Sequence, residues 1–251
     1  MEIAGRTAVV SGGASGIGRA ICLALARKGA RIVVADIDEA GGHETVRLVG
    51  EAGSQAVFQR CDVTRSEDLA AMLEAALSHF GSLDIVCNNA GIGERQDLFE
   101  DETREFERVV AVDLTAVIDA TRLAVRAMRT RGGGVIINTA SMGGLLPMPN
   151  NPVYAAAKAG VVNFTRSLAH LAETWNIRVN AICPSFTDTP LVRQAGEERM
   201  REVAQLVGGI LQPEFVAEGV VELVEDDSRA GAIMRVTVRG GRDFAKELRP
   251  Y

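Results

Sequence analysis

Tyr154 and Lys158 lie four residues apart in the stretch Pro-Val-Tyr-Ala-Ala-Ala-Lys, and they are the pair best suited to chemistry in this chain. Positions i and i+4 of a helix share a face, so the phenol and the ammonium should point into one space. A free tyrosine has a pKa of about 10, and a nearby positive charge favours its phenolate. The spacing therefore predicts a tyrosine that exchanges a proton with an alcohol or a ketone. An isolated pair of this kind is more often an ordinary tyrosine beside a solvated lysine, so the rest of the chain has to decide.

A glycine-rich segment between a predicted strand and a predicted helix is typical of a phosphate-binding loop. It reads Ser-Gly-Gly-Ala-Ser-Gly-Ile-Gly over residues 11–18. Glycines let the backbone approach a phosphate closely, and the start of a helix offers free N–H groups and a partial positive charge. The spacing is G-x-x-x-G-x-G, which differs from the G-x-G-x-x-G fingerprint. The loop residues expected to contact a cofactor are Gly12, Ser15, Gly16, Ile17 and Gly18.

Asp36 stands at the end of the second predicted strand, directly after Ala35 and 18 positions after Gly18. A carboxylate at this place can accept hydrogen bonds from the adenosine ribose hydroxyls of a dinucleotide, and it would repel a 2′-phosphate. The residue therefore predicts NAD rather than NADP as the cofactor. The alternative is a solvated residue at the start of a helix, because Asp38 and Glu39 follow directly.

Short apolar runs alternate with longer helical patterns along the whole chain. The predicted strands are Thr7–Val10, Arg31–Ala35, Ala56–Gln59, Leu83–Cys87, Val135–Asn138, Val179–Ile182 and Met234–Val238. The predicted helices are Ile17–Lys28, Glu39–Glu51, Ser66–His79, Glu102–Thr130, Val153–Trp175 and Pro213–Val224. This alternation indicates an α/β fold with helices on both faces of a parallel sheet, and right-handed crossovers make it doubly wound. We predict one Rossmann-type domain over residues 1–251, with about seven strands.

The stretch 187–211 departs from this alternation. It follows a strand, contains one proline and several glycines, and has no clear partner strand. We predict a lid over a binding cleft; a plain surface excursion is the alternative. Apolar side chains on and near this stretch suit a hydrophobic ligand, although packing against the body of the protein would also explain them. They are Leu145, Leu146, Met148, Phe186, Leu191, Val192, Met200, Val203, Leu206 and Ile210.

Composition and charge exclude several classes of function. The formal net charge is −6 and the pI is about 5.3, which argues against a general nucleic-acid-binding surface. The sequence contains no apolar run of about 18 residues, so we expect no membrane span, and the first strand begins too early for a signal peptide. The four cysteines are far apart and lie in apolar runs, which predicts buried free thiols and a cytoplasmic protein. The histidines lack metal-ligand spacing, so no metal is expected.

Taken in order along the chain, these features resemble the short-chain dehydrogenases/reductases, and the resemblance covers nearly the whole sequence. The matching motifs are the glycine loop, Cys61-Asp62-Val63 after the third predicted strand, Asn88-Asn89-Ala90-Gly91 after the fourth, Ser141 in Ile-Asn-Thr-Ala-Ser, the Tyr154/Lys158 pair, and Asn180-Ala-Ile-Cys-Pro184.

The resemblance implies an enzyme that moves a hydride between NAD and the carbon of an alcohol or ketone. Tyr154 would exchange the proton, and Lys158 would hold the nicotinamide ribose and lower the tyrosine pKa. Ser141 would hydrogen-bond the substrate oxygen. The further cofactor contacts that it implies are Asp62 and Val63 at the adenine, Asn89, Ala90 and Gly91 in the ribose region, and Pro184, Thr187 and Thr189 near a phosphate or the carboxamide.

Two positions depart from the pattern usual in this family. Asp113 stands where the family usually has Asn, in a helix whose local geometry frees a backbone carbonyl to hold a water for the lysine proton relay. The carbonyl remains, so we expect Asp113 to stay in the catalytic group, while its charge raises the tyrosine pKa slightly. Ser185 stands where Gly is usual after the proline, and its side chain would narrow the nicotinamide pocket.

Within the family, residues 146–154, 215–228 and 231–236 resemble the 15-hydroxyprostaglandin dehydrogenases. In these a Gln three residues before the tyrosine helps to hold the substrate hydroxyl; here that position is Asn151. The likeness implies oxidation of a secondary alcohol on a largely apolar small molecule, with Asn151 and Phe186 beside the substrate. Two alternatives remain open: an NADPH-linked carbonyl or 3-oxoacyl reductase, which Asp36 disfavours, and a non-catalytic nucleotide-binding relative.

The two longest predicted helices, 102–130 and 153–175, resemble those that the family pairs into four-helix interfaces. The resemblance therefore implies a homodimer or a homotetramer.

Overall fold

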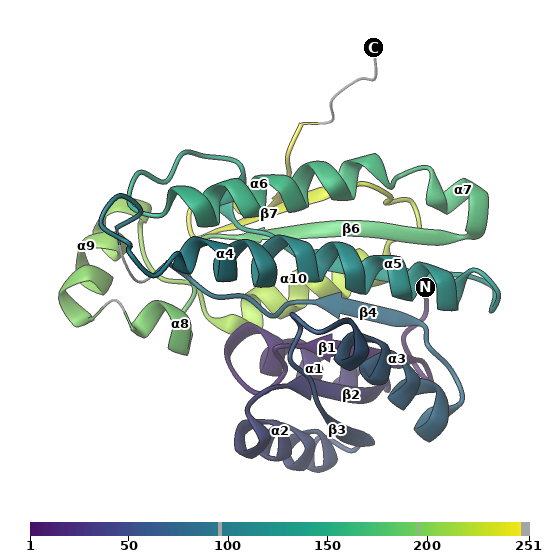
Figure 1. The fold of residues 1–251 in the computed structure, drawn as a ribbon. Helices are drawn as coiled ribbons and strands as arrows, with labels where there is room; N and C mark the ends of the chain where they lie inside the picture. Colours follow the sequence, from purple (N-terminus) through teal and green to yellow (C-terminus); the bar gives the residue numbers. More distant parts are fainter. Residues whose placement is uncertain (95–96, 195, 247–251) are drawn as a thin grey trace.

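The structure, a computed structural model, describes residues 1–94, 97–194 and 196–246. Within them Figure 1 shows one twisted sheet with helices on both faces. Its eight strands follow the order β3-β2-β1-β4-β5-β6-β7-β8, and all the pairs are parallel except β7 with β8. The strands are β1 (Thr7–Ser11), β2 (Arg31–Asp36), β3 (Ala56–Arg60), β4 (Ile85–Asn88), β5 (Gly134–Thr139), β6 (Ile177–Pro184), β7 (Ile233–Thr237) and β8 (Gly241–Phe244). The predicted doubly wound α/β fold is confirmed.

Burial on both faces explains why the central strands are continuous apolar runs rather than alternating patterns. Every residue of β1, β4, β5 and β6 is buried. One face is covered by α1 (Gly16–Arg27), α2 (Glu39–Glu51) and α10 (Pro213–Glu225), and the opposite face by α3 (Ser66–Phe80), α5 (Ala116–Met128) and α6 (Pro152–Ser167) (Figure 1). The shorter elements are α4 (Glu105–Val110), the π-helical turn η1 (Ala111–Thr115), the 3-10 turn η2 (Met142–Gly144), α7 (Leu171–Trp175), α8 (Pro190–Arg193) and α9 (Glu197–Val207).

The predicted helix over 102–130 is wrong in two respects. It begins later, because the Asp101 carboxylate accepts hydrogen bonds from the backbone N–H groups of Thr103 and Glu105 and makes a capping turn there. It is also interrupted, because η1 widens the helix between α4 and α5. In this turn the Ala116 N–H donates to Ala111 O, five residues back.

The predicted helix over 153–175 and the strand count also need correction. The helix ends at Ser167, where the chain tightens into bonds between residues three apart, and a separate short helix, α7, follows. The eighth strand, β8, was not predicted. Gly241 has a φ of +66°, which lets the chain reverse after β7 and return antiparallel to it. The strand itself reads Gly-Arg-Asp-Phe, and with two adjacent charged residues and one apolar residue it gives no strand signal.

A chain of polar side chains crosses the otherwise apolar layer between the sheet and the α5/α6 face. Asn88 Nδ2 donates to Thr121 Oγ1 at 3.0 Å and to Asn138 Oδ1 at 2.9 Å, and Asn138 Nδ2 donates to Thr165 Oγ1 at 3.0 Å. All four residues are buried. Buried polar groups are costly unless they are hydrogen-bonded, so this row of hydrogen bonds fixes β4, β5, α5 and α6 relative to one another.

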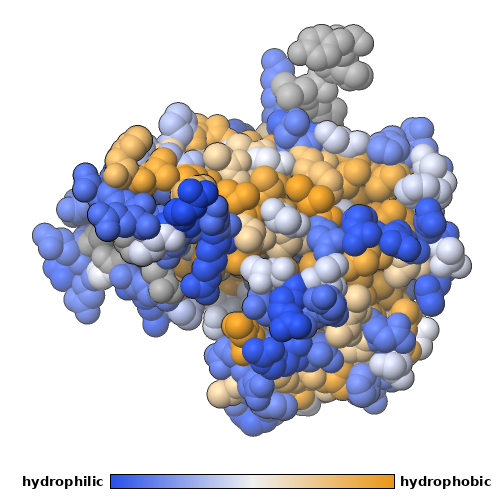
Figure 2. Space-filling model, viewed as in Figure 1, coloured by the Kyte–Doolittle hydropathy of each residue, from blue (hydrophilic) through white to orange (hydrophobic). Residues whose placement is uncertain are grey.

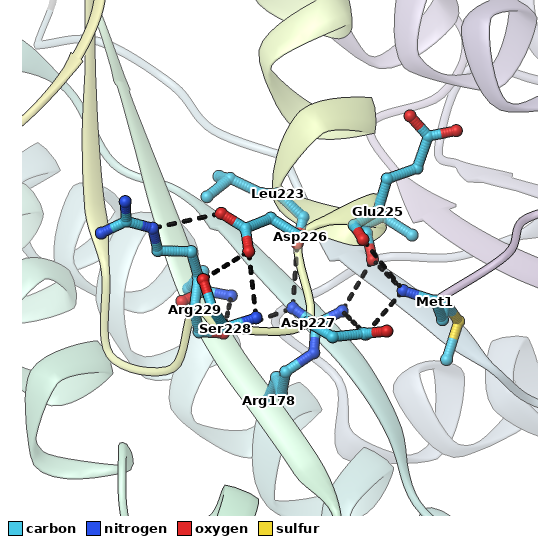
Figure 3. Close-up of polar contacts among 10 residues, drawn as sticks. Met1, Arg178, Leu223, Glu225, Asp226, Asp227, Ser228 and Arg229 are labelled. Atoms are coloured by element: carbon cyan, nitrogen blue, oxygen red, sulfur yellow. Dashed lines mark hydrogen bonds and ion pairs between the residues drawn. The ribbon is translucent and has the colours of Figure 1, made fainter.

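The end of α10 is held by positive charge (Figure 3). Arg178 of β6 is buried and donates to the carbonyls of Leu223 at 2.9 Å and Val224 at 2.6 Å, and the Met1 ammonium donates to Val224 O at 2.8 Å. Asp227 pairs with both cations. The last carbonyls of a helix lack partners within the helix and carry partial negative charge, so these cations satisfy and stabilise that end.

Figure 2 shows hydrophobic residues gathered over α6 and the adjoining part of α5, whereas Arg122 and Arg126 are exposed farther along α5. Ile118 on α5 is 39% exposed, and Ala156 and Ala159 on α6 are also exposed. The part of the chain that the structure describes contains no helix long and apolar enough to cross a membrane.

Candidate active site

The residues singled out from the sequence lie at one edge of the sheet, where β1 to β6 end. In parallel sheets ligands bind beyond these carboxyl ends, at the point where the strand order reverses. Here the order reverses between β1 and β4. The glycine loop follows β1 and Asn89 follows β4, so both flank this point.

Several positions of the glycine loop have a backbone conformation or a close contact that only glycine allows. Gly12 and Gly16 have φ angles of +67° and +51°. A Cβ on Gly12 would lie 2.8 Å from Ala90 Cα, and one on Gly18 would lie 1.9 Å from Gly12 O. Ser15 is the residue before α1 and its side chain does not cap the helix, so the free N–H groups of the first turn remain available. Ile17 lies in that first turn.

Asp36 is oriented toward the loop by backbone hydrogen bonds. Its Oδ2 accepts from Ala14 N at 2.9 Å and its Oδ1 from Asp38 N at 3.0 Å. The alternative reading of this segment is correct for Asp38, which caps α2 through Gly41 N at 3.1 Å. Asp36 itself stands at the rim, half-buried, where a ribose could reach its remaining lone pairs.

The segments after β3 and β4 also lie at the carboxyl ends of their strands. Asp62 Oδ1 accepts from the hydroxyl and the N–H of Thr64, and these bonds lower the pKa of the Asp62 carboxyl. Val63 is partly buried beside it. Asn89 Nδ2 donates to Ser11 O at 3.1 Å, which fixes the segment after β4 against the end of β1.

Tyr154 and Lys158 both lie in α6, one turn apart, with the Lys158 ammonium 5.6 Å from the centroid of the Tyr154 ring. Pro152 occupies the first turn, where its missing N–H costs nothing. The Tyr154 backbone N–H donates to Glu94 Oε1 at 2.8 Å, so a carboxylate from the loop after β4 caps this helix start. Tyr154 is half-buried, whereas Lys158 is 3% exposed.

The Lys158 ammonium is held by two acceptors. It lies 2.9 Å from Asp113 Oδ1, and it donates to Thr139 O at 3.1 Å. Burial, the largest influence, lowers the pKa of Lys158, but the charge of Asp113, together with Tyr154 and the hydrogen bond to Asp113, raises the pKa above its ordinary value overall. Asp113 is fully buried, and its other oxygen accepts from Ile92 N at 3.2 Å.

Gly91 lies directly against this ion pair. A Cβ at that position would lie 2.7 Å from Asp113 Oδ1 and 3.4 Å from Lys158 Nζ. Only a glycine therefore lets the segment after β4 pass over the pair without displacing it.

Ser141 follows β5 and is oriented by its own neighbourhood. Its Oγ accepts a hydrogen bond from Gly143 N at 3.0 Å, in the extended backbone that precedes η2. Because a serine hydroxyl has one proton and two lone pairs, this contact leaves the proton free to be donated elsewhere. The turn η2 packs against α6, which carries Tyr154 and Lys158.

The segment after β6 leads into the stretch predicted as a lid. Its base is closed, since Leu211 N donates to Phe186 O at 2.9 Å and Asp188 N donates to Leu211 O at 2.8 Å. Pro184 ends β6, and Thr187 is buried beside this closure. Thr189 caps α8 and lies next to the glycine loop: a Cβ on Gly16 would be 3.0 Å from Thr189 Cγ2.

Some apolar residues of this stretch pack against the body of the protein, and others are exposed and free to contact a hydrophobic ligand. Val203 is 4% exposed and packs inward, whereas Leu206 is 77% exposed.

Asn151 directly precedes α6 and is half-buried, but its side chain does not cap that helix. Ser185 is tied through its backbone N–H to Val236 O at 2.8 Å.

Three residues of the site were not predicted. Glu94 and Thr139 contact the helix start and the lysine, and Arg19 of α1 donates to Ala14 O, Gly41 O and Thr45 Oγ1, which fixes the glycine loop. A backbone carbonyl has no sequence signal, and Glu94 is one of many charged loop residues. The contact of Asp113 with Lys158 was also not foreseen, although both residues were.

Comparison with known proteins agrees with the family resemblance of the motifs. Residues 6–200 match the family model of the short chain dehydrogenases. The chain is 36% identical to 15-hydroxyprostaglandin dehydrogenase [NAD(+)] of Bos taurus over 97% of this chain and 95% of that one. It is 40% identical to cis-4-hydroxycyclohexanecarboxylate dehydrogenase of Sinomonas cyclohexanicum over 92% and 94% of the two chains.

The fold agrees with these sequence matches. The crystal structure of a short-chain type dehydrogenase/reductase from Mycobacterium marinum superposes with a TM-score of 0.88 at 28% identity, covering 94% of this chain and 95% of that one. Given the family model, these identities and this superposition, the chain belongs to the short chain dehydrogenase family.

Proposed function

We propose that this protein is an NAD-dependent oxidoreductase that interconverts a secondary alcohol and a ketone on a largely apolar small molecule. The observation that carries the proposal is the arrangement on α6, where a phenol and a buried ammonium lie one turn apart beside the Ser141 turn. The relatives named for oxidising hydroxyprostaglandin, hydroxycyclohexanecarboxylate and, in Acinetobacter, cyclohexanol support the alcohol as the substrate class.

The residues at the carboxyl edge fit a dinucleotide. The loop has no room for side chains at Gly12 and Gly18 and offers N–H groups from the first turn of α1, which suits a pyrophosphate. Asp36 stands at the rim for the adenosine ribose, and Asp62 with Val63 borders the adenine. Asn89, Ala90 and Gly91, with Pro184, Thr187 and Thr189, line the remainder. When bound there, NAD supplies the carbon that accepts the hydride.

In this proposal the side chains of Ser141, Tyr154 and Lys158 orient the substrate and transfer one proton. The Ser141 hydroxyl, whose oxygen is already bonded by Gly143, donates its proton to the substrate oxygen and holds it beside the phenol. During oxidation the Tyr154 oxygen takes the hydroxyl proton while the C–H bond breaks and the C=O bond forms. Lys158 favours the charged phenolate and has an N–H for the nicotinamide ribose.

We infer that the substrate is approached from the lid side. Phe186 at the base of residues 187–211 and Asn151 before α6 would border it, and the exposed apolar side chains there suit a hydrophobic molecule. The free, buried cysteines support a cytoplasmic location, because thiols stay reduced there. The exposed apolar band on α5 and α6 supports a homodimer or homotetramer.

Replacing the phenol separates catalysis from binding. We expect Tyr154→Phe to lower kcat for secondary alcohols by roughly 10²–10⁴-fold, because the ring remains and only the proton acceptor is lost. NAD binding, followed by quenching of the fluorescence of the single tryptophan or by calorimetry, should be little changed. Turnover measured by absorbance of the reduced nicotinamide, with NAD and NADP in turn, provides the readout.

Phe164→Tyr, on the same helix, is the matched control, since it adds a phenol away from Lys158 and should not restore activity to the Tyr154→Phe variant. Full turnover by Tyr154→Phe would overturn the proposed role of the phenol. Equal activity with both cofactors would instead favour the reductase alternative.

A further inference from the structure

The buried ion pair between Asp113 and Lys158 carries a consequence beyond the general reaction. Asp113 is 0% exposed and Lys158 is 3% exposed, and their charged atoms are 2.9 Å apart. Two opposite charges at this separation, shielded from water, interact strongly and act on their surroundings nearly as one neutral unit. The phenol one helical turn away therefore faces a compensated charge rather than a free ammonium.

The other groups around the Lys158 ammonium are uncharged, so they do not alter its pairing with Asp113. On its own helix the lysine faces Tyr154, from β5 it faces the carbonyl of Thr139, and from β6 it faces the Cys183 thiol. Burial raises the pKa of Cys183 to about 12, so this thiol is neutral at physiological pH. Among the described residues, Asp113 is thus the ionised group in direct contact with the ammonium.

The hydrogen-bond capacity of the lysine is also nearly used. An ammonium has three N–H donors. Thr139 O accepts from one of them, and Asp113 Oδ1 lies 2.9 Å from the same nitrogen, so both compete with a ribose hydroxyl or the phenol for the ammonium. Asp113 is in turn fixed by Ile92 N and by the close approach of Gly91, so the pair is held in place from the loop after β4.

We propose that Asp113 is a positioning residue whose carboxylate holds the Lys158 ammonium and offsets its charge, so that alcohol oxidation in this enzyme requires a higher pH than it would with a neutral side chain at position 113. This inference rests on the proposed function. Its physical basis is that a phenolate beside a compensated ion pair is stabilised less than one beside a free cation.

The test removes the charge and keeps the shape. In Asp113→Asn the pH of half-maximal kcat/KM for alcohol oxidation with NAD should fall by about one unit, the usual effect of one nearby charge. A second readout needs no cofactor. The chain has two tyrosines, so in a Tyr251→Phe background the ultraviolet absorbance of phenolate reports Tyr154 alone. The midpoint of this titration should fall in parallel with the pH profile.

Two further variants keep the test decisive. Asp113→Ser also removes the charge, and it should shift both midpoints in the same direction. Asp119→Asn removes a carboxylate from α5 that pairs with Arg122 instead of Lys158, and it should shift neither. Tyr251→Phe alone should have the pH profile of the unmodified chain.

The outcomes separate this inference from the proposed function. If the unmodified protein oxidises no secondary alcohol with NAD, the proposed function fails. If it does, but both neutral variants lose rate equally at every pH and leave the phenol titration unmoved, Asp113 is a structural residue and the inference is wrong. The inference is also overturned if neither neutral variant folds, as judged by circular dichroism, because the carboxylate is then required for folding.

Discussion

The hydroxyl of Ser141 shows how a single residue is prepared for a role by its neighbours. Its oxygen is bonded by Gly143 N, and its backbone lies in the extended form before a 3-10 turn, so the proton is directed away from that turn. Resemblance to the family singled out Ser141, Tyr154 and Lys158 as the catalytic candidates. It could not predict that Asp113 binds Lys158, because no spacing rule relates residues on different elements.

Removal of the Ser141 hydroxyl should therefore affect turnover more than binding. We expect Ser141→Ala to lower kcat by about 10²-fold, the usual cost of losing one oriented donor to a developing charge, with a smaller change in KM. Steady-state kinetics with a secondary alcohol give the answer. Ser167→Ala is the control, since that hydroxyl is exposed and bonds only within its own helix at Asn163 O. A kcat equal to that of the control would argue against a donor role for Ser141.

At the scale of elements, the central strands and the regular helices were predictable from apolar runs and helical periodicity. Helix α2 has the predicted bounds, and most other elements differ from prediction by a few residues. The errors arose where local contacts override periodicity: the Asp101 capping turn, the π-helical turn η1 and the split between α6 and α7. None of these depends on hydrophobic pattern, so the pattern could not reveal them.

The C-terminal end of α10 tests the stabilisation of an element by a distant residue. We expect Arg178→Met to lower the free energy of unfolding by about 3 kcal/mol, because buried helix carbonyls lose charged hydrogen bonds. Urea denaturation followed by circular dichroism measures the change. In Arg122→Met, which breaks an exposed i,i+3 pair on α5, the loss should be far smaller. Equal losses would mean that Arg178 does not stabilise this end.

At the scale of the whole molecule, the face of α5 and α6 that contains Ile118, Ala156 and Ala159 is an exposed apolar surface suited to a partner (Figure 2). Helix α6 also carries Tyr154 and Lys158, so an oligomer built through this face would lie next to the candidate site. The sequence indicated this surface only through resemblance to the family, because exposure of a helix face depends on how its neighbours pack.

If the proposed oligomer forms through that face, a charge placed there should prevent its assembly. We expect Ile118→Arg to lower the molar mass measured by size-exclusion chromatography with light scattering, because an unpaired charge in an apolar interface is strongly unfavourable. Leu206→Arg makes the same change on the exposed side of α9 and should leave the mass unchanged. If the Ile118→Arg protein keeps the mass of the unmodified chain, pairing through this face is excluded.

The polar chain from Thr121 through Asn88 and Asn138 to Thr165 limits how this protein can diversify. If a single member is replaced by an apolar residue, its neighbour is left as a buried polar group without a hydrogen-bond partner. A concerted replacement of adjacent members avoids this cost. Mutational paths through this region are therefore epistatic, and homologues should vary at these positions in groups. Engineering libraries for altered substrates would do better to randomise them jointly or to leave them untouched.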